Sequence, residues 1–213
     1  MWPGHGIVKS VPDRNFAAGL GIMRVIAGEF KSRQLKGAPG QISGLRPTSD
    51  RVRENVFNML GPIIEGAAFL DLFAGTGAVG VEALSRGARS AVFVESNAAA
   101  LRTIRDNVSA FGLGGRVEIV SRDVAKWLQS AGRPGRVFDV VYMDPPYASG
   151  VQLSTLEILG RGGLLGPDAV VILERKEPVD ADCTGVLRRT DSRKYGKTHI
   201  EIWQRNESMN GSG

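Results

Sequence analysis

The chain has 213 residues, a formal net charge of +5, and 42% hydrophobic and 23% charged residues. This is the composition of an ordinary globular domain, with a weak preference for a polyanionic partner. No apolar run approaches the roughly 18 residues that span a bilayer, and residues 1–22 lack the pattern of a secretory signal. Cys183 is the only cysteine, which excludes an internal disulfide and a cysteine metal cluster and fits a reducing cytoplasm. His5 and His199 lie far apart in the sequence, so we expect no metal site.

Residues 1–22 carry proline, glycine and scattered polar residues without periodicity, so we expect a poorly ordered leader. From Met23, the stretches MRVIAG and FKSRQLKG predict a small β-hairpin with long basic side chains. A helix is expected from Thr48 or Ser49, either of which can cap it, to about Leu60. The sequence thus predicts a basic N-terminal extension over residues 23–62, a main domain over 63–205 and a flexible tail over 206–213.

The main domain alternates strands and helices. Strands are predicted over 67–73, 91–95, 116–121, 137–143 and 169–174, with helices over 78–86, from the cap Asn97 to about 111, and over 124–130 and 153–159. Residues 186–192 and 198–204 alternate apolar and polar side chains, as in an antiparallel hairpin. Repeated strand–helix units imply right-handed crossovers. We therefore expect an α/β fold: a doubly wound, mainly parallel, seven-stranded sheet with a C-terminal antiparallel hairpin and an N-terminal basic β-hairpin.

A glycine-rich loop follows the first predicted strand of the main domain. Its sequence is Phe73-Ala74-Gly75-Thr76-Gly77, which can turn tightly and bring backbone N–H groups close to a ligand beside a helix N-terminus. The spacing Gly75, Gly77 and Gly80 also fits the GxGxxG pattern of dinucleotide sites. The loop alone therefore leaves a pyrophosphate site and a plain tight turn both open.

Acidic residues end three successive strands. Asp71 lies four residues before Gly75, where a carboxylate would repel a pyrophosphate but accept hydrogen bonds from an ammonium group. Glu95 ends the second strand, where an acid can hold ribose hydroxyls, and Asp123 follows the third, where it can accept a bond from an adenine amine. Together the three acids suit a cationic nucleoside without phosphate. S-adenosylmethionine is such a molecule, and we expect it as the cofactor.

The fourth strand runs into Asp144-Pro145-Pro146-Tyr147. Proline has no N–H for a sheet ladder and fixes its own φ, so the chain leaves the sheet here in a stiff, preset shape. It presents a carboxylate, a firmly held carbonyl and an aromatic face. That set suits the binding of an aromatic amine, such as a nucleobase with an exocyclic NH2.

Two basic segments flank a nearly neutral middle. Residues that we expect to contact nucleic-acid phosphates are Arg24, Lys31, Arg33 and Lys36 in the first segment and Arg193, Lys194 and Lys197 in the second. Basic surface loops are common in proteins that bind no nucleic acid, so this pattern alone does not identify the partner.

The sequence resembles the class I methyltransferases that act on exocyclic amines and, more closely, the RsmD family, which methylates the guanine N2 of one small-subunit (16S) ribosomal RNA nucleotide. The resemblance covers Met23 to about Arg205. It rests on MRVIAGEFKSRQL, RPTSDRVRENVFNML, DLFAGTGAVGVEALSRGA, FVES, DPPY and KYGKTHIEIW, taken in this order and spacing.

The resemblance implies a role for each matching residue. Asp71, Gly75 and Gly77 would line the methionine end of the cofactor, Glu95 would take the ribose hydroxyls, and Asp123 with the Val124 N–H would bind the adenine edge. Phe73, Ala74, Thr76 and Ser96 complete this set, and Thr48 and Arg51 fall in the segment that covers the pocket in such enzymes. Asp144, Pro145, Pro146 and Tyr147 would hold the target base. The expected partner is ribosomal RNA or an assembling small subunit in the cytoplasm, bound by a monomer without membrane or metal.

Three alternatives remain open at this point. A DNA adenine-N6 methyltransferase, or another nucleic-acid amino-methyltransferase, would use much the same pocket and the same DPPY, although the spacing leaves little room for a target-recognition insertion. An NAD-linked oxidoreductase would explain the glycine loop and Glu95 but not Asp71 or DPPY. A non-catalytic RNA-binding protein with a relic pocket would not need the intact acids.

Overall fold

The structure is a computed structural model, and it describes residues 23–37, 50–131, 136–146, 150–161, 163–177 and 181–205. The expected leader, the expected tail and two predicted site residues, Thr48 and Tyr147, lie outside the described residues. In the described part of the chain, no helix combines the length and the apolar character that crossing a bilayer requires.

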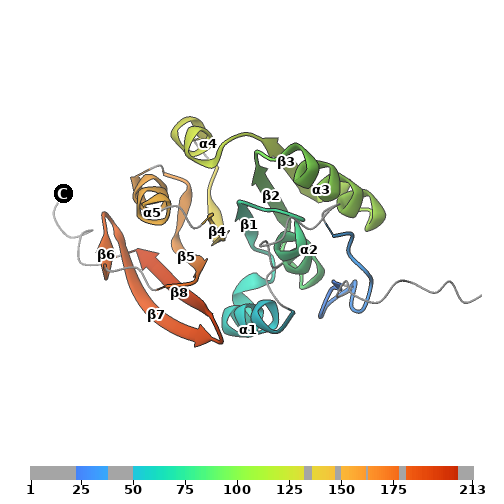
Figure 1. Ribbon diagram of the computed structural model, residues 1–213, viewed down its shortest axis with the longest axis horizontal. Coiled ribbons are helices and arrows are strands. Elements are labelled where there is room, and N and C mark those ends of the chain that lie inside the picture. The colour runs from blue at the N-terminus through green and yellow to red at the C-terminus, as the bar shows by residue number, and fades with distance from the viewer. Residues whose placement is uncertain are drawn as a thin grey trace, which may run out of the picture.

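One mainly parallel sheet organises the described chain (Figure 1). Its strands are β1 (Ala68–Leu72), β2 (Ser90–Glu95), β3 (Val117–Ser121), β4 (Phe138–Met143), β5 (Leu165–Arg175), β6 (Cys183–Thr184), β7 (Leu187–Tyr195) and β8 (Thr198–Arg205). They lie in the order β3-β2-β1-β4-β5-β8-β7-β6. Pairing is parallel from β3 to β5 and antiparallel from β5 through β8 to β6. The predicted doubly wound α/β fold with a C-terminal antiparallel hairpin is therefore confirmed.

The helices connect these strands as expected. They are α1 (Asp50–Leu60), α2 (Ala78–Ser85), α3 (Ala98–Ala110), α4 (Val124–Ala131) and α5 (Val151–Arg161), with short 3-10 turns η1 (Gly61–Ile64) and η2 (Gly114–Arg116). The predicted cap of α3 is confirmed, because the Asn97 side chain accepts hydrogen bonds from the Ala99 and Ala100 N–H groups.

Two details of the sheet differ from the prediction. The sheet has eight strands rather than seven, because the two-residue β6 pairs with the start of β7. A pair that short carries no periodicity that sequence could reveal. In addition, β5 begins at Leu165 instead of Ala169. Gly166-Pro167 favours a loop, yet Leu165 pairs with Phe138 before the register shifts between Phe138 and Val140.

The core consists of two apolar clusters, one on each face of the sheet. One cluster joins Phe69 and Tyr142 to side chains of α1, α2 and α3. The other joins Leu70 and Val141 to side chains of α4 and α5. Because neighbouring strand residues point to opposite faces, each central strand contributes to both clusters. In Figure 1, α4 and α5 lie on one side of the strands and α1 on the other.

Residues 23–37, here called the N-terminal ribbon, form one β-bridge, Arg24 to Gln34, and pack onto α2 and α3. The side chain of Ser85 joins the ribbon to α2, since its Oγ accepts from Phe30 N at 2.9 Å and donates to the Ala27 carbonyl at 2.6 Å. At α3, the Asn107 Oδ1 accepts from Lys36 N at 2.8 Å. The ribbon is thus part of the same packed body as the helices.

A buried ionic network lies under the ribbon. The Glu82 carboxylate, on α2, accepts from Ile26 N at 2.7 Å and Ala27 N at 3.0 Å, and pairs with Arg86 at 2.7 Å and with Arg53 at 3.6 Å. The Arg53 guanidinium also donates to the Arg24 carbonyl. Glu82 and the Arg53 side chain have no solvent exposure, so their charges are compensated within the protein.

We expect Gly28→Ala to detach the ribbon from α2. Gly28 has a φ of +82°, and a Cβ there would overlap the Ser85 carbonyl oxygen. The variant should lose about 2–3 kcal/mol of unfolding free energy, measured by urea denaturation. Gly37→Ala is the matched control, because a Cβ at Gly37 would meet no described residue within 4 Å. Equal stability of the two variants would contradict the close contact at Gly28.

Candidate active site

The glycine loop between β1 and α2 holds three residues at positive φ. Phe73 has a φ of 59°, Gly75 of 55° and Gly77 of 75°. A positive φ is uncommon for a phenylalanine, and such strain is found most often at functional sites. The back of the loop is closed, because a Cβ at Gly77 would lie 3.3 Å from both Ile104 and Phe93. Among the described residues, only the Phe73 carbonyl comes within 4.0 Å of a Cβ position at Gly75. The described part of the chain therefore leaves the loop open at Gly75.

Glu95, at the end of β2, holds this loop in place. Its Oε2 accepts from Gly75 N at 2.9 Å, and its Oε1 accepts from Ser96 N and Asn97 N, each at 2.8 Å. An ionised carboxylate offers about four acceptor positions, so capacity remains for hydroxyl groups of a ligand. The side chain is half-buried.

Asp71, on β1, is a buried acid below the loop. It is 2% exposed, and its Oδ2 accepts from Gly80 N at 3.0 Å. Burial raises the pKa of Asp71 well above its usual value, the Gly80 N–H opposes this, and the negative charges of Glu95 and Asp144 add to it. A cation bound nearby would relieve these repulsions and favour the carboxylate.

Asp144, which directly follows β4, is a second acid that is partly buried. Burial, together with the negative charge of Glu174, raises the pKa of Asp144 to about 8. Pro145 is buried and Pro146 is exposed, so the chain turns outward directly after the acid. Glu95 and Asp144 both contribute to the raised pKa of Asp71. The acids near the ends of β1, β2 and β4 therefore lie close enough to repel one another.

Asp123 has a structural role in addition to the predicted one. Its Oδ1 accepts from Lys126 N at 3.0 Å, and its carbonyl accepts from Trp127 N at 2.9 Å, so it caps α4. The side chain is exposed and Val124 is buried. Binding of an adenine edge by these two residues stays a prediction.

The donor set fits S-adenosylmethionine better than a dinucleotide. Burial and repulsion by neighbouring acids already disfavour the charged forms of Asp71 and Asp144. A pyrophosphate beside them would add to this repulsion, whereas an ammonium or sulfonium would relieve it. Among the residues that the structure describes, no group of three or more His, Cys, Asp or Glu side chains is arranged to hold a metal ion.

Two of the predicted RNA-contacting residues, Arg33 and Lys36, contact α3. Arg33 lies over the Phe111 ring at 4.3 Å and donates to the Ala110 carbonyl at 2.6 Å. Lys36 forms an exposed ion pair with Asp106 at 3.1 Å. These two basic side chains therefore help to fasten the ribbon to α3, a role that charge counting along the sequence does not reveal.

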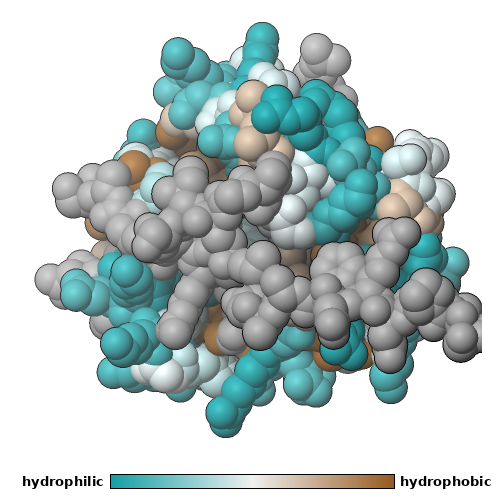
Figure 2. All heavy atoms as spheres, turned by 45° about the vertical axis from the view of Figure 1, so that its right-hand side comes forward, coloured by the Kyte–Doolittle hydropathy of each residue, from teal (hydrophilic) through white to brown (hydrophobic). Residues whose placement is uncertain are grey.

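The remaining basic residues lie on the surface. Every residue of the predicted set is exposed, Arg33 and Lys36 included; the others are Arg24, Lys31, Arg193, Lys194 and Lys197. Arg51, in the first turn of α1, is exposed as well. Arg193 pairs with Asp191 at 2.8 Å. Figure 2 shows that hydrophilic side chains cover most of the visible part of one face, with hydrophobic atoms only in small areas between them.

Some buried polar groups near the site were not predicted; they belong to Tyr142, Glu174, Glu82 and Asn107. Glu174 accepts a hydrogen bond from the Tyr142 hydroxyl, and Glu82 accepts backbone hydrogen bonds from the ribbon. Asn107 donates to the Thr76 carbonyl at 3.0 Å and so joins the glycine loop to α3. Helical or strand periodicity indicates only that these positions face inward; it does not indicate which partner a polar side chain finds there.

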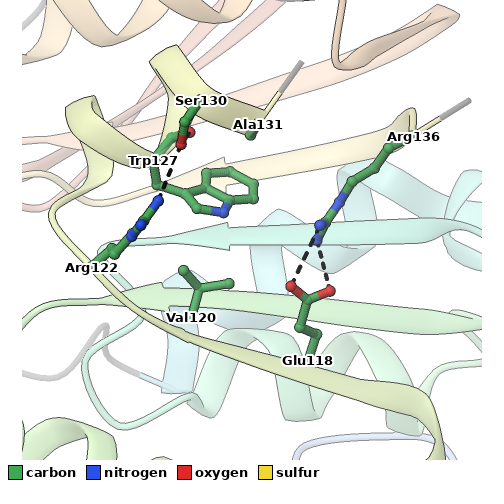
Figure 3. Close-up of a pocket in the computed structure, with 7 residues that line it drawn as sticks. All are labelled: Glu118, Val120, Arg122, Trp127, Ser130, Ala131 and Arg136. Carbon is green, nitrogen blue, oxygen red and sulfur yellow. Dashed lines mark hydrogen bonds and ion pairs between the residues drawn. The ribbon is translucent and has the colours of Figure 1, made fainter. Parts of the chain in front are cut away.

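A separate pocket of about 290 Å³ lies between β3 and α4 (Figure 3). Its charged residues have partners within the pocket lining: Arg136 pairs with Glu118 at 2.9 Å, and Arg122 donates a hydrogen bond to the Ser130 hydroxyl at 3.3 Å. Arg136 also lies over the Trp127 ring at 5.4 Å. None of the predicted site residues lines this pocket, so it does not belong to the candidate active site.

Residues 23–204 match the family described as "Conserved hypothetical protein 95". A relative from Escherichia coli K12, named "Ribosomal RNA small subunit methyltransferase D", is 37% identical over 157 residues, covering 74% of this chain and 76% of the relative. The protein of the same name from Haemophilus influenzae is 33% identical over 159 residues, covering 74% of this chain and 80% of its own.

The chain belongs to this family. The solved structure of Escherichia coli yhhF, 32% identical, superposes with a TM-score of 0.76 over 87% of this chain and 99% of its own. The resemblance to the RsmD family that the sequence indicated is thus confirmed for the fold and the family. The role of each site residue in this family member stays a prediction.

We expect Asp144→Asn to stabilise the ligand-free protein, increasingly as the pH rises. With a pKa of about 8, folded Asp144 keeps its proton at pH values where the unfolded chain has released it. The wild type therefore loses stability between the ordinary carboxyl range and pH 8, whereas asparagine does not titrate. The gain should approach about 1.4 kcal/mol per pH unit in this window, measured by urea denaturation at several pH values.

The exposed Asp168, changed to Asn, controls for the loss of one charge. A stability difference for Asp144→Asn that stays constant from pH 5 to 9, as for this control, would show that Asp144 is not the titrating group.

Proposed function

We propose that this chain transfers a methyl group from S-adenosylmethionine to the exocyclic N2 amine of a guanine in small-subunit ribosomal RNA. The observation that carries the proposal is the convergence of Asp71, Glu95 and Asp144 at the carboxyl edge of the sheet, with Pro145 and Pro146 directly after the last acid. The relatives named as small-subunit ribosomal RNA methyltransferases support the substrate class.

The residues around the glycine loop would hold the cofactor. Asp71, with Gly75 and Gly77, would bind the methionine end, and Glu95 the ribose hydroxyls. Asp123 and the Val124 N–H would bind the adenine. When bound, S-adenosylmethionine supplies an electrophilic methyl group on a cationic sulfur. The acidic pocket would favour that positive charge and exclude phosphate-bearing nucleotides.

The segment after β4 would hold the target base. The Asp144 carboxylate and the Pro145 carbonyl would each accept an N–H bond from the amine, which allows the nitrogen to pyramidalise and its lone pair to face the methyl group. Tyr147 would stack on the base, a contact worth roughly 1–3 kcal/mol. The guanine has to leave its own stack before it can enter the site.

The RNA partner would be bound in the cytoplasm as free ribosomal RNA or as an assembling small subunit, by a monomer without a metal. The exposed basic residues of the ribbon and of the β7–β8 hairpin support an electrostatic contribution to binding. Such phosphate contacts would depend on the shape of the RNA rather than on its base sequence.

Mass-spectrometric mapping of small-subunit ribosomal RNA from cells that lack the gene tests the function. We expect one N2-methylguanine to disappear and to return when the wild-type gene is restored. An unchanged set of methylated guanines, or loss of a methyl group from DNA adenine instead, would overturn the proposal.

Asp144→Ala should retain cofactor binding and lose methyl transfer. The rate should fall about 100-fold or more, because a group that stabilises the transition state is removed. Single-turnover assays at saturating cofactor measure this, with calorimetric titration of S-adenosylhomocysteine as the control for binding. A near-normal rate would remove Asp144 from the catalytic role.

The double variant Lys194→Gln/Lys197→Gln should bind RNA with a weaker dependence on salt. Each lost contact with a single-strand phosphate lowers the slope of log affinity against log salt by about 0.7. The double variant Lys126→Gln/Arg161→Gln carries the same charge change on α4 and α5, outside the predicted RNA surface, and should leave the slope unchanged. Equal slopes for both variants would argue against contact at the hairpin.

A further inference from the structure

Two residues without a role in the proposed mechanism lie beside Asp144. Glu174, near the end of β5, is 8% exposed, and Tyr142, on β4, is 2% exposed. The Tyr142 hydroxyl donates a hydrogen bond to the Glu174 carboxylate. Burying an acid at the carboxyl edge of a sheet costs free energy. Buried acids of this kind are found most often at functional sites.

The register of the sheet places Glu174 next to Asp144. Met143 and Leu173 form the last parallel pair of β4 and β5, and Asp144 and Glu174 each follow by one residue. Side chains two residues apart on a strand share a face, so Asp144 lies on the same face as Tyr142. Glu174 is also the group whose charge acts on Asp144.

The chemistry of the proposed reaction gives this pair a task. Methyl transfer forms a bond between the amine nitrogen and the methyl carbon, and the electron pair of the carbon–sulfur bond stays with sulfur. The nitrogen then carries a methyl group, two hydrogens and a positive charge. One N–H proton must leave for the neutral product to form, and the acceptor nearest to the amine would be Asp144.

We propose that Glu174, fixed by the hydroxyl of Tyr142, is a positioning residue that makes Asp144 the acceptor of the proton released by the methylated amine. This inference rests on the proposed function. The N–H protons become acidic as the nitrogen–carbon bond forms, and a more basic carboxylate stabilises the developing positive charge better than an isolated aspartate does. The negative charge of Glu174 on the same face makes Asp144 a stronger base, and the hydrogen bond from the Tyr142 hydroxyl fixes the position of the Glu174 carboxylate.

Among the described residues, Glu174 is the charged group that acts on Asp144, in addition to burial. Glu95, on β2, acts instead on Asp71 of β1. On the far side of Glu174, β8 presents Ile200, which has no charge. Beyond it on β7, Arg193 is exposed and paired with Asp191.

The first test needs neither cofactor nor RNA. Carboxyl NMR of the ligand-free protein, with the Asp144 signal assigned from Asp144→Asn, should show a titration midpoint near 8 in the wild type. The midpoint should fall by about one unit in Glu174→Gln, because a neighbouring like charge is removed. It should fall by less in Tyr142→Phe. Glu157→Gln, an exposed position on α5, controls for the charge change and should leave it in place.

The second test is the pH dependence of single-turnover methyl transfer. The wild-type rate should rise with pH up to about 8. In Glu174→Gln the rise should move to lower pH, and the plateau should fall because Asp144 becomes a weaker base. Binding of S-adenosylhomocysteine should be unchanged, which separates this outcome from a general loss of structure.

Unchanged midpoints and profiles in both Glu174→Gln and Tyr142→Phe would overturn the inference. If Glu174→Gln does not fold, Tyr142→Phe decides, because it keeps the ring and removes only the hydroxyl. Failure of the proposed function would look different, since the wild type itself would then methylate no guanine amine.

Discussion

The buried carboxylate of Glu82 is the interaction on which the arrangement of the site depends. It accepts backbone hydrogen bonds from the N-terminal ribbon, pairs with Arg53 of α1 and lies on α2, directly after the glycine loop. Two segments that are far apart in the sequence, the ribbon and α1, are therefore fixed to the helix that follows the loop. Loss of one partner would leave a buried charge uncompensated, which typically costs about 3–5 kcal/mol. The network thus specifies where the ribbon lies relative to the loop.

The candidate site is assembled at the expense of stability. Desolvation raises the pKa of both Asp71 and Asp144, and each acid adds its own repulsion to a neighbour. Such groups destabilise the free protein at neutral pH. A core built for stability alone would place apolar residues there, as it does at Phe69 and Val140 lower on the same strands. The excess negative charge is explained if the natural occupant is a cation that neutralises it.

Helices, strands and their buried faces could be predicted from the sequence, because periodicity and local chain geometry control them. Contacts between side chains far apart in the sequence could not be predicted in this way. The stripe of Leu101, Ile104, Val108 and Phe111 identified the buried face of α3, and all four side chains are buried. Arg53, by contrast, is a charged residue of α1, a type that is rarely buried, yet it is 1% exposed. Its partner Glu82 lies 29 residues away, and no local pattern joins the two. Glu174 was missed for the same reason, since its neighbour Asp144 lies on another strand.

Around the site, acidic and basic groups lie at different depths, and this arrangement suits two ligands of opposite sign. Asp71 and Asp144 lie at the buried edge of the sheet, where the low dielectric keeps their influence strong at short range. Exposed basic groups lie on the ribbon and on the β7–β8 hairpin, where salt screens charges over about 8–10 Å. Phosphates on the surface would therefore feel mainly the basic groups, and a ligand in the pocket mainly the acids. One small domain can in this way attract a polyanion to its rim while its interior accepts a cationic cofactor.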